Sequence, residues 1–308
     1  MDLILWSGAI LVGIILLVKS GDKLSDKIVE VAEKAGVSPL IISIVVISLA
    51  TTLPEITTSA IASYEGANGI ALGNALGSIF ANIALILGMA ALLRPLESGR
   101  EAFKNSIAML LSLLLVILLS LDGELSRADG AILLMAYVIY LYWLYRSHVG
   151  LKVEEHRGES TPFDYLLLLI LGLLLVAGAK LVVYGGENIA EKLGVSEYVI
   201  GATVVAIGTS LPEMTNALYG ALRNRGSVSV GNIIGANIMN ALIVLGLASL
   251  IRPIQTAASV LTLVFVFSAM IPLIISLRLR NGLDRRIGVY FLSLYALYLF
   301  LLLKGASL

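Results

Sequence analysis

The chain contains an internal repeat. Residues 37–95 match residues 195–253 at a constant offset of 158 without a gap, and 19 of the 59 aligned positions are identical. Chance similarity between apolar segments does not keep polar and helix-breaking residues in register. The identities nevertheless include Pro54/Pro212, Glu55/Glu213, Gly73/Gly231, Asn74/Asn232, Gly77/Gly235, Asn82/Asn240, Arg94/Arg252 and Pro95/Pro253. We therefore expect two copies of one structural unit.

Hydrophobicity places both copies in a membrane. Of the 308 residues, 58% are apolar and 14% charged, and the mean hydropathy is +0.97, which exceeds what a water-soluble domain needs. Apolar segments long enough to cross a hydrocarbon core of roughly 30 Å recur along the chain. They predict an all-α integral membrane protein with ten spans, near residues 3–18, 38–64, 70–93, 103–121, 128–145, 163–183, 196–222, 228–251, 257–277 and 286–303.

The spans divide into two groups of five around a polar linker, residues 146–162. The predicted domains are therefore residues 1–145 and 163–308, and five spans per copy make the repeats inverted in the membrane. Sixteen Lys and Arg residues lie in loops or at span ends on the linker's side, against 5 on the other side. By the positive-inside rule, we expect a plasma-membrane protein with a cytoplasmic linker and both termini extracellular.

The segment after the first span is rich in charge of both signs, with four lysines between Lys19 and Lys34. It is expected to form either an amphipathic stretch at the membrane surface or a solvated charged face.

Several functional classes are disfavoured by composition. The chain has no cysteine, and its two histidines, His148 and His156, lie in the linker, which argues against soft-metal sites. The formal net charge of zero argues against a nucleic-acid partner. The spans hold no Ser/His pair, aspartate pair or thiol, so we predict that the protein is not an enzyme. No cofactor or protein partner is inferred; the expected partners are inorganic cations and the lipid bilayer.

Each copy carries a Leu-Pro-Glu motif inside a span, ending at Glu55 and at Glu213. Proline has no N–H, so the carbonyl four residues earlier loses its helical donor. Irregular backbone at membrane depth is tolerated where it lines a cavity, and a cation can satisfy the freed oxygens. Hydroxyl groups on the same turns add further oxygens, at Thr51, Thr52, Thr209 and Ser210.

Glu55 and Glu213 are the ionisable residues predicted near the middle of spans, and no Lys, Arg or His occurs in residues 37–63, 70–93, 198–222 or 228–251. Because an ionised group there is costly when unpaired, the countercharge is expected to be a proton or a mobile cation. The structural alternative is a pair of protonated glutamic acids that only joins the repeats.

The next span of each copy carries Gly-Asn-x-x-Gly followed by Asn82 or Asn240. The paired glycines predict close helix approach. The asparagines either join helices or offer amide oxygens to a cation. Carboxylate, amide, hydroxyl and carbonyl oxygens suit hard cations, and a flexible set with two charges favours Ca²⁺ or Na⁺ over Mg²⁺. Two carboxylates can balance the charge of one Ca²⁺, of sodium ions or of protons. If calcium and the monovalent ions cannot bind together, one leaves as the other enters, and this competition would itself produce exchange.

At these motifs the chain resembles the cation/calcium exchanger superfamily, most closely its prokaryotic sodium/calcium exchanger members. The resemblance extends over all ten spans and implies antiport of calcium against sodium by alternating access. It implies that Glu55 and Glu213 bridge calcium with the carbonyls of Thr51 and Thr209. Flanking sodium sites would draw on Ser48, Thr51 and Ser78 on one side, and on Ala206 and Thr209 on the other. The first and sixth helices would slide across the site, and glycines such as Gly13, Gly172 and Gly178 would either permit this or only allow close packing.

Some positions depart from that family's pattern. Asn240 stands where many members have an acid, and Ala236 where a serine often helps bind sodium. Ala75 and Ile233 follow the Gly-Asn pairs, where the proton-coupled branch has a glutamate soon after, and this favours sodium. Calcium/proton exchange remains the alternative, and a passive channel is a second rival, although a single-chain inverted repeat favours alternating access.

Overall fold

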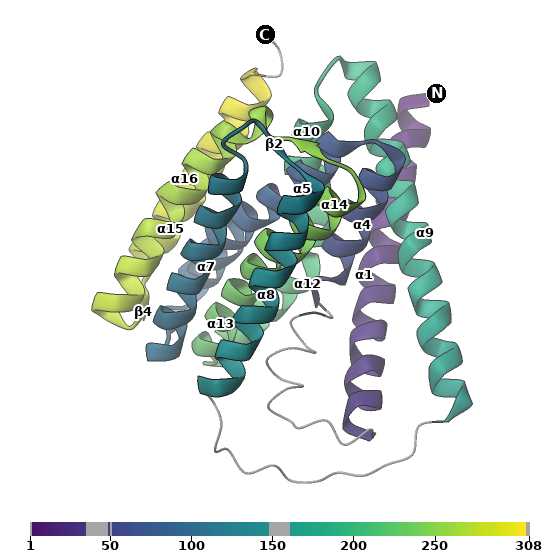
Figure 1. Ribbon diagram of the computed structural model, residues 1–308. Helices are drawn as coiled ribbons and strands as arrows, with labels where there is room; N and C mark the ends of the chain where they lie inside the picture. Colours follow the sequence, from purple (N-terminus) through teal and green to yellow (C-terminus); the bar gives the residue numbers. More distant parts are fainter. Residues whose placement is uncertain (1, 35–48, 50, 148–160, 306–308) are drawn as a thin grey trace.

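The computed structural model describes residues 2–34, 49, 51–147 and 161–305; residues 1, 35–48, 50, 148–160 and 306–308 lie outside the description. The described chain is almost entirely helical (Figure 1). Its elements are α1 (Asp2–Lys34), α4 (Leu53–Glu65), α5 (Asn68–Phe80), η2 (Ala81–Leu87), α6 (Gly88–Leu93), β1 (Leu96–Glu97), α7 (Arg100–Leu119), β2 (Glu124–Leu125), α8 (Arg127–Ser147), α9 (Pro162–Leu193), α10 (Glu197–Ile200), η3 (Gly201–Val205), α11 (Ala206–Thr209), α12 (Leu211–Leu222), α13 (Gly226–Met239), η4 (Asn240–Val244), α14 (Leu245–Ile251), β3 (Ile254–Gln255), η5 (Ala257–Ser259), α15 (Val260–Arg280), β4 (Gly282–Leu283) and α16 (Arg285–Gly305).

Eight helices in the described part of the chain are long and apolar enough to cross a membrane. The second and seventh predicted spans are shorter, broken pieces. The seventh consists of α10, η3 and α11, followed by α12 after a break at Ser210. Of the second span, α4 is described, and most of its first half lies outside the described residues. The all-helical membrane fold is thus confirmed.

Two helical segments form the centre of the bundle. In Asn68–Leu93 (α5, η2 and α6) and in Gly226–Ile251 (α13, η4 and α14), 78% of the most apolar window is buried, against 22% for α1 and for α8. The same segments carry the Gly-Asn motifs. A Cβ added to Gly73 would lie 2.5 Å from the carbonyl oxygen of Tyr198, and one added to Gly77 would lie 2.7 Å from Cα of Ala202. The first glycine pair therefore permits the predicted close approach, here between α5 and the α10–η3 segment.

Two short ladders reveal the symmetry of the repeats. In β1 and β4, Leu96 lies opposite Leu283; in β2 and β3, Leu125 lies opposite Ile254. Adding the repeat offset of 158 to positions 96 and 125 gives positions 254 and 283. The two ladders are therefore equivalent, because exchanging the repeats turns the β1–β4 ladder into the β2–β3 ladder. Figure 1 shows β2 and β4 at opposite ends of the bundle. The all-helical prediction did not include these strands, because they form between segments far apart in the sequence.

The chain ends also follow the inverted arrangement. In Figure 1, α1 begins and α16 ends at the top, whereas α8 ends and α9 begins at the bottom. The two repeats thus start and finish as expected for five crossings each.

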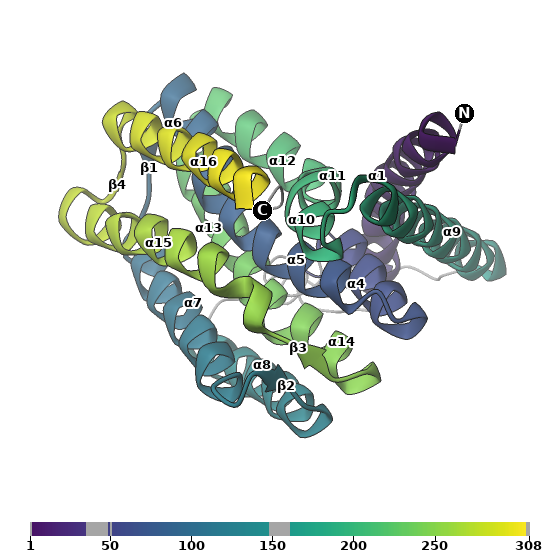
Figure 2. The ribbon, with the colours of Figure 1, turned by 90° about the horizontal axis from the view of Figure 1, so that it is seen from above.

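The helices α1 and α9 run side by side at one flank of the bundle (Figures 1 and 2). A Cβ on Gly13 would lie 2.7 Å from the carbonyl oxygen of Gly178, and a Cβ on Gly178 would lie 2.9 Å from that of Gly13. The two backbones therefore touch at this crossing. Gly172 has no such neighbour among the described residues.

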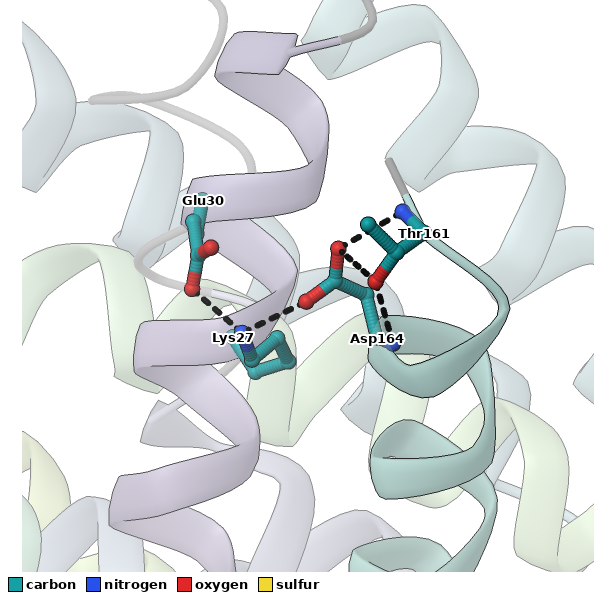
Figure 3. Close-up of polar contacts among 4 residues, drawn as sticks. All are labelled: Lys27, Glu30, Thr161 and Asp164. Atoms are coloured by element: carbon teal, nitrogen blue, oxygen red, sulfur yellow. Dashed lines mark hydrogen bonds and ion pairs between the residues drawn. The ribbon is translucent and has the colours of Figure 1, made fainter. Parts of the chain in front are cut away.

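The charged segment that ends at Lys34 is helical and continues α1 without a break after the first predicted span. It forms the last turns of α1, because no proline interrupts residues 2–34 and the helix continues to pack along α9. Lys27 joins the two helices there (Figure 3). Its Nζ lies 2.9 Å from Oδ1 of Asp164 and 2.5 Å from Oε2 of Glu30. Asp164 also forms a capping box with Thr161 at the start of α9.

Candidate functional site

Each Leu-Pro-Glu motif begins a helix at a break in its span. Thr52 precedes α4 with φ −87° and ψ 1°, and Ser210 precedes α12 with φ −82° and ψ 10°. Both glutamates then occupy the third position of their helix. The first turn of a helix has unsatisfied N–H groups that favour a negative charge, so the local fold suits carboxylates at these positions.

The two glutamates are fully buried. Glu55 and Glu213 are both 0% exposed. Oε1 of Glu55 accepts a hydrogen bond from Oγ of Ser210 at 3.0 Å, so the second repeat contacts the first repeat's carboxylate. Among the described residues, Oε2 of Glu55 and both carboxylate oxygens of Glu213 have no hydrogen-bond partner. Buried acceptors without donors are costly, and a bound cation or proton would satisfy them.

Hydroxyl residues face the glutamates across the repeat interface. Thr209 lies beside Glu55, and Thr51, its equivalent in the first repeat, lies beside Glu213. The two carboxylates also interact electrostatically with each other. The structure thus brings Thr51, Thr209, Ser210 and both glutamates into one cluster, and Thr52 is buried at the start of α4.

Asn74 is a buried member of this cluster that the predicted site did not include. Its Nδ2 donates to Oγ of Ser59 at 2.8 Å and to the backbone oxygen of Glu55 at 3.3 Å. Its Oδ1 accepts from Oγ1 of Thr209 at 2.9 Å. Asn74 therefore ties α4 and α5 to α11. Its identity with Asn232 in the repeat was the available signal.

Asn82 and Asn240 lie on π-helical turns, in η2 and at the start of η4. Such wide turns occur frequently at functional sites. The turn η2 packs against α12, which carries Glu213, and η4 packs against α4, which carries Glu55. Both asparagines are fully buried. Oδ1 of Asn82 and both amide atoms of Asn240 have no partner within the described part of the chain.

The remaining predicted site residues fall into two groups. Ser78 and Ala206 lie together, because Oγ of Ser78 donates to the backbone oxygen of Ala206 at 3.4 Å. The same oxygen accepts from Oγ1 of Thr209 at 3.3 Å. Ser48 lies outside the described residues.

The donor set of this cluster is rich in oxygen and poor in charge. The described residues contain no group of three or more His, Cys, Asp or Glu that could hold a metal ion. The cluster instead combines two carboxylates with neutral amide, hydroxyl and carbonyl oxygens. Such a set fits a hard cation that can also leave.

Comparison with known proteins gives a consistent result. A family model described as "Sodium/calcium exchanger protein" matches residues 5–146 and 163–304. The putative antiporter CaxA of Alkalimonas amylolytica is 36% identical over 292 residues, covering 91% of each chain. The sodium/calcium exchanger MaX1 of Methanosarcina acetivorans is 29% identical over 339 residues, covering 95% of this chain and 97% of its own. A structure of the sodium-calcium exchanger NCX_Mj, soaked with Na⁺ and Sr²⁺, matches with a TM-score of 0.68 at 35% identity, covering 96% of this chain and 98% of that one.

Proposed function

The chain belongs to the sodium/calcium exchanger protein family, and from that premise we propose that it exchanges calcium for sodium across the plasma membrane by alternating access. The observation that carries the proposal is the pair of buried glutamates, Glu55 and Glu213, whose oxygens are mostly without partners in the described structure. Their spans contain no basic residue. A mobile cation is therefore the countercharge that this site requires.

The proposed calcium site lies between the two repeats. Glu55 and Glu213 bind the ion, with the backbone oxygens of Thr51 and Thr209 completing the coordination. The side chains of Asn82 and Asn240 approach from the adjacent π-helical turns. Two carboxylates neutralise one Ca²⁺, and the neutral oxygens replace part of its hydration shell.

The proposed sodium sites flank the calcium site. One uses Ser48, Thr51 and Ser78, and the other uses Ala206 and Thr209, with Thr52 and Ser210 as neighbouring hydroxyls. Oγ of Ser78 contacts the backbone oxygen of Ala206, so Ser78 also lies beside the second of these proposed sites. Sodium ions on these oxygens compete with calcium for the same carboxylates, so loading one ion expels the other, and each loaded form can reorient.

The proposed topology places the 146–162 linker in the cytoplasm between domains 1–145 and 163–308, with both termini outside. The excess of Lys and Arg on the linker's side supports this orientation. Cysteine accessibility provides a direct check, since the chain has no native cysteine. A cysteine introduced at Ser307 should react with an impermeant maleimide on intact cells, and one introduced at Ser160 should not.

The decisive experiment is radioactive calcium uptake into vesicles that contain the purified protein. An outward sodium gradient should drive uptake, and the Glu55→Gln and Glu213→Gln variants should abolish it. Uptake driven only by an outward proton gradient would instead establish calcium/proton exchange, the alternative function of the same fold. Uptake that survives both substitutions would contradict the site.

A further inference from the structure

A pair of buried amides connects the two repeats beside the glutamate cluster. Nδ2 of Asn82 donates to Oδ1 of Asn237 at 2.9 Å. Asn237, on α13, is 1% exposed and was not among the predicted site residues. Its own Nδ2 donates to the backbone oxygen of Ile79 at 3.3 Å and to the sulfur of Met109 at 3.6 Å.

The chemistry of these partners fixes which group is the donor and which the acceptor in each of these hydrogen bonds. A backbone carbonyl can only accept, so Asn237 must present its NH₂ group to Ile79. Its carbonyl oxygen then faces Asn82. Asn82 must therefore present its own NH₂ group to Asn237, and its Oδ1 is turned away from Asn237.

The orientation matters because Oδ1 is the atom of Asn82 that can bind a cation. This oxygen is buried and has no partner among the described residues. It lies on η2, which packs against the helix of Glu213. If the amide were reversed, a positively polarised NH₂ group would take its place and repel a cation.

We propose that Asn237 is a positioning residue for the cation site. It acts through Asn82, because it holds the Oδ1 atom of Asn82 toward the ion. The proposal rests on the proposed function in one respect, that Asn82 contributes to cation binding. The arrangement is specific to one repeat. The position equivalent to Asn237 is Ile79, which has no side-chain donor or acceptor, so Asn240 has no matching support from the first repeat.

The test is a double-mutant cycle with calcium binding to the purified protein as the readout, measured by calorimetry. Asn82→Ala and Asn237→Ala should each weaken calcium binding by roughly tenfold, as expected for losing one oriented ligand. The double variant should bind within about twofold of Asn82→Ala, because Asn237 has no effect once its target is absent. Asn237→Ser, which also removes the amide oxygen, is made in parallel in case Asn237→Ala does not fold.

Met109→Leu is the matched control, since it changes the other partner of Asn237 at nearly constant volume and should leave binding unchanged. Losses that multiply in the double variant would overturn the proposal, as would an Asn237→Ala variant with normal affinity. Normal binding by Asn82→Ala would also overturn it. Failure of the proposed function is distinguishable, because it would appear as wild-type protein that binds calcium but, in vesicles, takes none up when an outward sodium gradient is applied.

Discussion

In the first repeat, Oε1 of Glu55 accepts a hydrogen bond from Ser210 and Asn82 is held by Asn237, whereas in the second repeat Thr51 lies beside Glu213 and both amide atoms of Asn240 have no hydrogen-bond partner among the described residues. The four residues form two equivalent pairs at an offset of 158. Equivalent sequence thus does not give equivalent surroundings. In the proposed site, the first repeat would therefore offer a pre-oriented half, and the second would offer a half whose side chains can adjust to the ion.

The differences arise from residues that the repeat does not preserve. Ile79 corresponds to Asn237, and Ser78 corresponds to Ala236. By contrast, the helix pairs are joined at the same positions in both copies. In the first repeat, Ser59 donates to the carbonyl of Ala71. The equivalent positions in the second repeat are Ala217 and Ser229, and there Ser229 donates to the carbonyl of Ala217, so the donor and acceptor positions are exchanged. The hydrogen bonds that join these helices therefore lie at the same positions in both repeats, whereas the hydrogen bonds that orient the proposed cation ligands do not.

The largest expected effect tests what the two halves share. Glu55→Gln and Glu213→Gln should each reduce sodium-driven calcium uptake at least about a hundredfold. The buried calcium ion would lose one of its two negatively charged partners, and such a loss is strongly destabilising. Uptake into vesicles is the measurement. Glu65→Gln is a suitable control, since Glu65 lies on the same helix as Glu55 but pairs at the surface with Lys180 at 3.9 Å. Near-normal uptake by one of the two variants would show that only one repeat holds the ion.

A second substitution should have opposite signs in the two repeats. Asn240→Asp adds a carboxylate where no fixed partner opposes it, and we expect calcium to bind about tenfold more tightly. Asn82→Asp places a carboxylate against the amide oxygen of Asn237, and binding should weaken by about the same factor. Calorimetric titration of both variants makes the comparison. Equal changes of the same sign would mean that the supports of the two asparagines do not matter.

A smaller effect concerns the serine that only one repeat carries. Ser78→Ala should raise the sodium concentration for half-maximal exchange about threefold, because one neutral oxygen is lost. Ala236→Ser should lower it by a similar factor, since it supplies the missing hydroxyl. Calcium uptake as a function of the sodium gradient measures both. A rise in both variants would indicate that the serine acts through packing alone.

The smallest effect is expected far from the proposed ion site, where Lys27 joins α1 to α9. Hydrogen bonds from Lys27 to Glu30 and to Asp164 raise the pKa of Lys27 above its usual 10.5. A raised lysine pKa contributes stability that is fully present below the unfolded-state pKa and is lost as the pH rises through the folded-state value.

Lys27→Met should therefore lower the melting temperature slightly, by the same amount at about pH 7 and about pH 9, without changing calcium affinity. Lys104→Met is the control, since Lys104 forms an exposed pair with Glu101 on α7. A large change in calcium affinity in Lys27→Met would show that this contact is coupled to the site.

The sequence by itself determined the membrane environment, the two equivalent halves, the helix breaks before Glu55 and Glu213, and the lack of basic partners in their spans. These properties depend on residue type, spacing and internal repetition, which are visible along the chain. Two features lay beyond its reach. The ladders between β1 and β4 and between β2 and β3 join distant segments, and α1 continues to Lys34 because it packs along α9.

Only the tertiary structure decided how the polar side chains of the proposed site are oriented. Asn74 bonds to Thr209, 135 positions away, and Asn82 bonds to Asn237, 155 positions away. An amide side chain has a donor and an acceptor on one group, and the sequence does not state which one will be turned inward. That choice is made by the partner across the repeat interface, because a hydrogen bond forms only between a donor and an acceptor.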